Sequence, residues 1–266
     1  IRALSPDGTT RVFAGTADHF ISDGTATASE FRFPQGIAIG PSGTVYVAQT
    51  PHDVIRQITP DMEVSTYCGI CGSRGTRDGA RLNATFAKPR SLAVDGEENL
   101  YIMDFKYSLV RRVDRKTGLV TTIAGNFKTA PGGGIDGYPE SSTFCWPEGI
   151  AVDPDGNVLV ADSSSQRIRI IYKDDGDVYS VAGRVITWAG FGTPEGFDSS
   201  NADGRASNGF FHSPWNIAVG GHGDLFITDK HGNRIRYLDA YLPKGKFSKE
   251  KPRTYEDVLD EWLDSP

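Results

Sequence analysis

The sequence of 266 residues has few sulfur-containing residues, only three Cys and two Met, and no long hydrophobic segment. No run of consecutive apolar residues approaches the ~20 that a transmembrane helix needs, so no membrane span is predicted. Basic residues are outnumbered, 28 Lys and Arg against 34 Asp and Glu, and the net charge of −6 argues against nucleic acid as a partner. No helix-period stretch separates the apolar segments of the repeat described below, which excludes a parallel α/β fold.

Glycine and proline, in contrast, are plentiful, with 31 Gly and 15 Pro. Together with 11% aromatic residues, this composition is typical of a packed, turn-rich all-β domain. At roughly 150 residues per domain, the length allows one large domain or two small ones. The sequence begins at Ile1 and not at an initiator Met, so we expect a processed chain or further residues upstream.

A four-part repeat organises most of the chain. Each unit opens with Phe-x-x-Pro, continues through a short apolar strand, a Gly-rich turn and a second strand, and then shows a third strand with an apolar–Arg pair. A fourth strand ends in a small residue and Gly, and an Asp-Gly pair precedes the next Phe-x-x-Pro. The four Phe-x-x-Pro segments are residues 31–34, 86–89, 144–147 and 211–214.

Four short strands per unit cannot bury both faces of a sheet, whereas units stacked around an axis can, so the repeat predicts an all-β propeller of four-stranded blades. The Gly-Ile-Ala-Val type of strand is expected to be innermost. The Phe of each Phe-x-x-Pro is expected to wedge between blades, contributing about 2–3 kcal/mol each. We predict a propeller domain over residues 1–240.

These units resemble the NHL-repeat family. The resemblance is carried by PEGIAVD at 147–153, GNVLVAD at 156–162 and RIR at 167–169, and it covers residues 1 to about 238. It implies a propeller fold, but the family includes enzymes, RNA binders and adhesion modules, so it does not fix a function.

The units do not close into a whole number of blades. Segments 31–69, 86–125 and 144–183 read as complete blades, with the last fourth strand ending at Ala182-Gly183. Residues 1–15 match only strands three and four, and 211–238 only strands one to three. The ring is expected to have four blades, with Val12-Phe13 as the last strand, or five or six, or to be completed by a neighbouring chain. We favour the larger ring.

In an NHL-like ring, the residue after each Phe-x-x-Pro lies at the mouth of the central channel. These residues are Gln35, Arg90, Glu148 and Trp215. The similar amidating lyases place zinc-binding His there, and the gluconolactonase-like propellers place Asn, Asp and Glu around a divalent cation. None of the four positions is His and only one is a carboxylate, so we predict no metal, no cofactor and no catalytic residue. The four residues are instead candidates for binding.

Cysteine usage and one sequon bear on the compartment. Cys68 and Cys71 form a C-x-x-C, for which we favour a local disulfide, with reduced thiols or a bridge from Cys145 as alternatives. Asn83-Ala84-Thr85 is an N-glycosylation sequon, so an N-linked glycan is expected at Asn83. Together these features favour an extracellular or secreted protein.

The last residues break the repeat. Residues 241–253 form a basic linker, after which Thr254 can cap a short helix. Its apolar stripe would dock on the propeller, on a partner or on a second copy of the chain, and it consists of Tyr255, Val258, Leu259 and Trp262.

The sequence therefore predicts a non-enzymatic interaction or scaffold module that binds a protein partner or further copies of itself. Self-assembly through the unfinished terminal blades is one form of this hypothesis. The alternative is a propeller hydrolase or lyase with a site at the channel mouth. RNA binding is disfavoured because the only basic cluster lies in the linker.

Overall fold

The computed structural model describes residues 1–16, 21–126, 134–173, 185–190, 209–220 and 223–238. In these residues the fold is all-β, apart from three short 3₁₀ helices. None of the described helices is long or apolar enough to cross a membrane. The predicted C-terminal helix and basic linker lie outside the described residues.

Four antiparallel sheets follow one another along the chain and form the blades of a propeller. Blade 1 has the strand order β3-β7-β6-β5-β4, and its strands are β3 (Gly24–Thr25), β4 (Pro34–Ile39), β5 (Val45–Gln49), β6 (Val54–Ile58) and β7 (Glu63–Cys68). Blade 2 has the order β8-β12-β11-β10-β9, with β8 (Gly79–Ala80), β9 (Pro89–Val94), β10 (Leu100–Asp104), β11 (Leu109–Val113) and β12 (Leu119–Ala124).

The third and fourth blades repeat this plan with fewer strands. Blade 3 has the order β13-β14-β15-β16, with β13 (Pro147–Val152), β14 (Val158–Asp162), β15 (Arg167–Ile171) and β16 (Val185–Ala189). Blade 4 consists of β17 (Pro214–Val219), β18 (Leu225–Asp229) and β19 (Arg234–Leu238). The 3₁₀ helices connect the second and third strands of blades 1 to 3 and are η1 (Thr50–His52), η2 (Phe105–Tyr107) and η3 (Ser163–Ser165).

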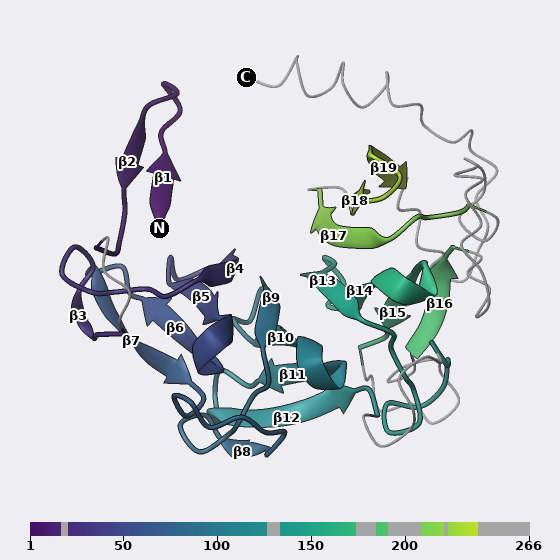
Figure 1. Cartoon of the computed structure of the whole chain (residues 1–266), viewed down its shortest axis with the longest axis horizontal. Coiled ribbons are helices and arrows are strands. Elements are labelled where there is room, and N and C mark those ends of the chain that lie inside the picture. Colours follow the sequence, from purple (N-terminus) through teal and green to yellow (C-terminus); the bar gives the residue numbers. More distant parts are fainter. Residues whose placement is uncertain (17–20, 127–133, 174–184, 191–208, 221–222, 239–266) are drawn as a thin grey trace.

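The blades form an arc around a common centre, with β4, β9, β13 and β17 innermost (Figure 1). The apolar inner strands are therefore at the axis, as predicted. They approach closely enough to require glycine: a Cβ on Gly149 would lie 2.7 Å from the Cα of Asn216 in the next blade. Gly36 of β4 meets the backbone of Arg90 in the same way. The propeller fold predicted from the repeat is confirmed.

One buried arrangement recurs in each blade and explains three of the repeated motifs together. The Arg of the third strand lies over the ring of the Phe-x-x-Pro Phe, 5.1 Å from its centroid for Arg111 and Phe86. Arg111 also donates to Asp78 of the Asp-Gly pair at 2.6 Å and to Asp104 at the end of the second strand at 3.3 Å. Equivalent rings lie under the other third-strand Arg residues, in the pairs Arg56–Phe31, Arg169–Phe144 and Arg236–Phe211.

The Phe side chains wedge between blades, as expected. Phe86 packs in a cluster that joins Tyr46 and Ile55 of blade 1 to Leu92 of blade 2. Phe144 and Phe211 join the next two pairs of blades in the same manner. The core of the molecule thus lies between the sheets.

The fourth strand of blade 3 differs from the prediction. It is β16, which pairs with β15 and is followed by Gly190 at φ 96°, the conformation that Gly69 and Gly125 adopt after the other fourth strands. The strand therefore ends at Ala189-Gly190 and not at Ala182-Gly183, because extra residues separate β15 from β16.

A hairpin of β1 (Arg2–Leu4) and β2 (Thr10–Val12) precedes blade 1. It occupies the position of strands three and four of a preceding blade, because Phe31 packs with Ala14 as the other Phe residues pack with the blade before them. Within the described residues β2 pairs with β1 and not with β19. In the described residues Val12-Phe13 therefore does not supply a fourth strand to blade 4, and the arc of described blades is open (Figure 1); the number of blades in the ring stays a prediction.

Candidate functional site at the mouth of the hub

The chain brings the first residues of the four inner strands together. Each inner strand starts at the Pro of a Phe-x-x-Pro, so the next residue occupies the same position in every blade. The four residues predicted for the channel mouth line one pocket of about 550 Å³, here called the hub pocket: Gln35, Arg90, Glu148 and Trp215. Two positions further along the strands, Ile37, Leu92, Ile150 and Ile217 form its apolar wall.

The residue before each of these Pro residues has a left-handed backbone. Its φ is 45° at Phe33, 59° at Lys88, 49° at Trp146 and 75° at Ser213. A residue before Pro favours extended backbone, so each of these four positions, here called elbows, costs on the order of 1–3 kcal/mol.

The two sides of the molecule are named by the connections that they carry. The elbow face carries the elbows and the 3₁₀ helices. The turn face, on the opposite side, carries the turns between first and second strands.

An ion pair between two blades lies in the hub pocket. Arg90 Nη1 donates to Glu148 Oε1, and the guanidinium lies 3.3 Å from the centroid of the Phe105 ring. The Glu148 side chain is only 8% exposed. Burial raises the pKa of Glu148, and the hydrogen bond from Arg90 opposes this shift. The carboxylate is therefore held by a cation that is itself fixed on an aromatic ring.

Aromatic groups continue this arrangement on both sides. The rings of Trp146 and Phe105 lie 5.3 Å apart, and Trp146 is 56% exposed. On the other side of the pocket Lys230 Nζ lies 3.6 Å from the Trp215 ring centroid. We call this series of side chains the hub strip: Trp146, Phe105, Arg90, Glu148, Lys230 and Trp215.

Chemically, the hub pocket combines one ion pair with an apolar wall. Among the described residues that line it, Glu148 is the only carboxylate and there is no His. The hydroxyl of Ser91 accepts a hydrogen bond from Ile150 N–H at 3.2 Å. Nowhere in the described part of the chain do three or more His, Cys, Asp or Glu gather as a metal site.

Sequence reasoning found one ring of this site and missed the rest. Phe105 and Lys230 directly follow second strands, and Trp146 is an elbow residue. The residue type at each of these two positions differs from blade to blade. The elbows share a backbone conformation but not a residue type. A search for aromatic residues directly before the repeated Pro could have found Trp146.

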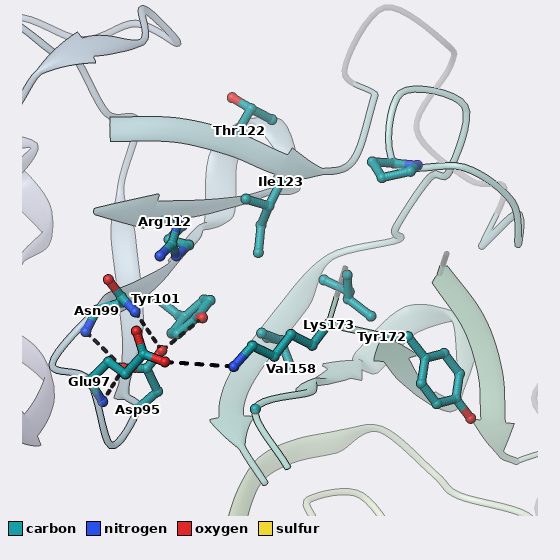
Figure 2. A pocket seen from close by; sticks show the side chains of 13 residues that line it. Asp95, Glu97, Asn99, Tyr101, Arg112, Thr122, Ile123, Val158, Tyr172 and Lys173 are labelled. Carbon is teal, nitrogen blue, oxygen red and sulfur yellow. Dashed lines mark hydrogen bonds and ion pairs between the residues drawn. The ribbon is translucent and has the colours of Figure 1, made fainter. Parts of the chain in front are cut away.

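A second pocket, of about 410 Å³, lies between blades 2 and 3 on the turn face. Figure 2 shows Glu97 reaching across it to Lys173, 3.8 Å away, and Asp95 accepting from Asn99 and Tyr101. Burial raises the pKa of Tyr101 to about 12. Each of these groups is engaged by a neighbour, and the Glu97–Lys173 pair connects blade 2 to blade 3.

The remaining sequence predictions have different outcomes. Cys68 and Cys71 are free thiols, so the predicted local disulfide is not formed. Cys68 is fully buried in the core between blades 1 and 2, whereas Cys71 is exposed and lies 3.7 Å from His52 Nδ1. Asn83 is exposed in a turn, and its glycosylation stays a prediction. The stripe Tyr255, Val258, Leu259 and Trp262 lies outside the described residues.

Comparison with known proteins agrees with this architecture. The NHL repeat family profile matches residues 144–171. The chain is 24% identical over 245 residues to NHL repeat-containing protein 2 of Gallus gallus and 26% identical over 249 residues to Teneurin-1 of Homo sapiens. These alignments cover 83% and 85% of the chain, respectively. Among solved structures, a streptogramin B lyase superposes with a TM-score of 0.51 over 83% of the chain, at 14% identity.

The chain spans only part of each of these proteins. It covers 33% of the length of NHL repeat-containing protein 2, 9% of Teneurin-1 and 56% of the lyase chain. The likeness to the lyase, at this identity, concerns the fold alone.

Proposed function

Because the chain belongs to the NHL-repeat β-propeller family, we propose that it is an interaction module that binds a protein partner through the hub strip. The observation that carries this proposal is the exposure of Trp146 and Trp215 beside the Arg90–Glu148 ion pair. Both tryptophans lie on the elbow face. Large exposed aromatic residues around a pocket are typical of the centres of protein interfaces. Preordered cations on aromatic rings lower the entropy cost of binding.

A pair of variants tests this proposal. Trp146→Ala combined with Trp215→Ala removes the aromatic ends of the hub strip. Leu82→Ala with Leu119→Ala removes two exposed apolar side chains from the outer part of blade 2 and serves as the control. In capture experiments analysed by mass spectrometry, we expect a protein that binds the unmodified chain and the control but not the tryptophan variant. A partner retained equally by all three proteins would contradict the proposal.

The alternative hypothesis is a hydrolase or lyase with a channel-mouth site. Measurement of the metal content of the purified protein tests it. We expect purified protein to hold no stoichiometric divalent cation. An ion bound in stoichiometric amount and lost in Glu148→Gln would favour the enzyme instead.

Self-association is a second candidate, favoured by apolar residues at the two ends of the arc. Ile37 and Ile39 of β4 are 52% and 67% exposed, because β1 and β2 supply no inner strands to cover them. At the other end, Ile235 of β19 is 73% exposed. Sedimentation velocity should show a concentration-dependent larger species that Ile39→Lys with Ile235→Lys abolishes. A single monomer at the highest concentration would contradict this candidate.

We extend the proposal to the compartment and place the module outside the cell. The exposure of the Asn83 sequon supports this, since a glycan needs an accessible Asn. Enzymatic deglycosylation of the protein secreted by eukaryotic cells should convert Asn83 to Asp, and mass spectrometry would detect this change.

A further inference from the structure

The elbow face presents exposed positive charges, although the chain as a whole has a negative net charge. Four exposed cations, Arg32, Lys88, Lys106 and Lys230, lie on it, in elbows and in the connections after second strands. None of them forms an ion pair within the part of the chain that the structure describes. Lys88 and Lys106 are in adjacent segments, joined by a hydrogen bond from Lys106 N–H to Ala87 O.

The acidic groups of this face nearest the hub are buried and paired, and the more exposed Asp23, Asp78 and Asp136 pair with third-strand Arg residues. Asp53 is 2% exposed, accepts from Lys88 N–H at 2.7 Å and pairs with Arg74 at 3.1 Å. Glu148 is held by Arg90 in the hub pocket. At the ends of the second strands, Asp104, Asp162 and Asp229 face the third-strand Arg residues. Among the described residues around the hub pocket, the exposed charges that lack an ion pair are therefore positive.

The turn face is different. Exposed acidic residues such as Asp61, Glu97 and Asp155 lie there together with Lys116 and Lys173. The chain as a whole carries a net charge of −6, so the unpaired cations of the elbow face contrast with the sign of the total charge. A localised field of this kind selects partners by charge and speeds their encounter.

We infer that the hub strip recognises an acidic protein segment that combines carboxylates with an apolar side chain. The carboxylates would meet the exposed cations, and the apolar group would enter the hub pocket against Ile37, Leu92, Ile150 and Ile217. This inference rests on the proposed function and adds the chemistry of the partner. A nucleic acid fits less well, because its phosphates would meet the Glu148 carboxylate and an apolar wall.

A random peptide library displayed on phage provides the test. Selection against the unmodified protein should enrich peptides rich in Asp and Glu with at least one large apolar residue. Their affinity should fall about tenfold in a variant with Arg32→Gln, Lys88→Gln and Lys106→Gln. A matched variant with Arg115→Gln, Lys116→Gln and Lys173→Gln, which loses the same charge from the turn face, should bind within twofold. Unchanged unfolding temperatures would show that both variants are folded.

The outcomes separate this inference from the proposed function. Neutral or basic peptides that still require Trp146 and Trp215 would overturn the acidic partner but leave the hub strip as a binding surface. Peptides that bind the tryptophan variant equally well would overturn both. A failure to select any peptide, or tighter binding of a single-stranded RNA than of the selected peptides at physiological salt, would also overturn the inference.

Discussion

At the scale of single residues, a buried pair between a third-strand Arg and a second-strand Asp recurs in the blades, and one blade lacks the Asp. Blades 2, 3 and 4 place an Asp at the end of the second strand, against the third-strand Arg. Blade 1 has Gln49 in this position, and neither its amide nor Arg56 Nε and Nη1 finds a hydrogen-bond partner within the described residues. Among the described residues, Asp23 is then the one carboxylate that pairs with Arg56. Blade 1 is thus the least satisfied of these sites.

The same comparison predicts a stability difference. Asp104→Asn removes the fully buried partner of Arg111 and should lower the free energy of unfolding by about 3 kcal/mol, because it leaves a buried charge less compensated. Asp78→Asn acts on a side chain that is 45% exposed and should cost about 1 kcal/mol. Urea denaturation of both variants checks this order, and equal losses would contradict it.

Glu148 allows a prediction of pH dependence. Burial raises its pKa in the folded protein, so the ionised carboxylate is disfavoured there relative to the unfolded chain. Its contribution to stability therefore falls as pH rises through the unfolded and then the folded pKa. The unfolding temperature of Glu148→Gln, relative to the unmodified protein, should be higher at pH 7 than at pH 4. The opposite sign would show that Arg90 more than offsets the burial.

At the scale of strands, close approach at the axis is the tightest constraint. Gly149→Ala would place a Cβ 2.7 Å from Asn216 Cα and 2.8 Å from Trp215 O, both backbone atoms of blade 4. We expect a loss of about 2–3 kcal/mol, since neither strand can move without disturbing the hub. Gly96→Ala, which meets no atom within 4 Å, should change stability by less than about 0.5 kcal/mol. Thermal unfolding distinguishes the two.

The strands also show what sequence can and cannot predict. Inner and third strands were located correctly because Phe-x-x-Pro and the apolar–Arg pair each report a buried contact that every blade needs. The last strand of blade 3 was misplaced because Ala182-Gly183 lies 15 residues after Ile168, close to the spacing in the other blades, whereas Ala189-Gly190 lies at the end of the strand that forms. A small residue followed by Gly occurs at both places, and only pairing with β15 decides between them.

The candidate site follows the same division. The ring of Gln35, Arg90, Glu148 and Trp215 could be predicted, since register after a repeated Pro fixes their position. Phe105, Trp146 and Lys230 could not, because they come from connections that differ between blades. The predicted disulfide failed for a related reason: C-x-x-C spacing does not reveal that Cys68 points into the core.

At the scale of the whole molecule, the described blades form an open arc (Figure 1), and the unpaired exposed cations named above lie on one of its two faces. The asymmetry of charge predicts that the protein binds a carboxylate resin at neutral pH despite its net charge of −6. The variant with Arg32→Gln, Lys88→Gln and Lys106→Gln should elute at lower salt than the matched turn-face variant. Equal elution would show that the positive charge is not concentrated on the elbow face.

The central claim is that the elbow face binds a partner, and hydrogen–deuterium exchange of the complex with its captured protein tests it most directly. We predict that protection from exchange is concentrated in residues 31–35, 86–90, 144–148 and 211–215, around the hub pocket. Protection confined to the turn face, such as residues 95–99 and 153–157, would contradict the account.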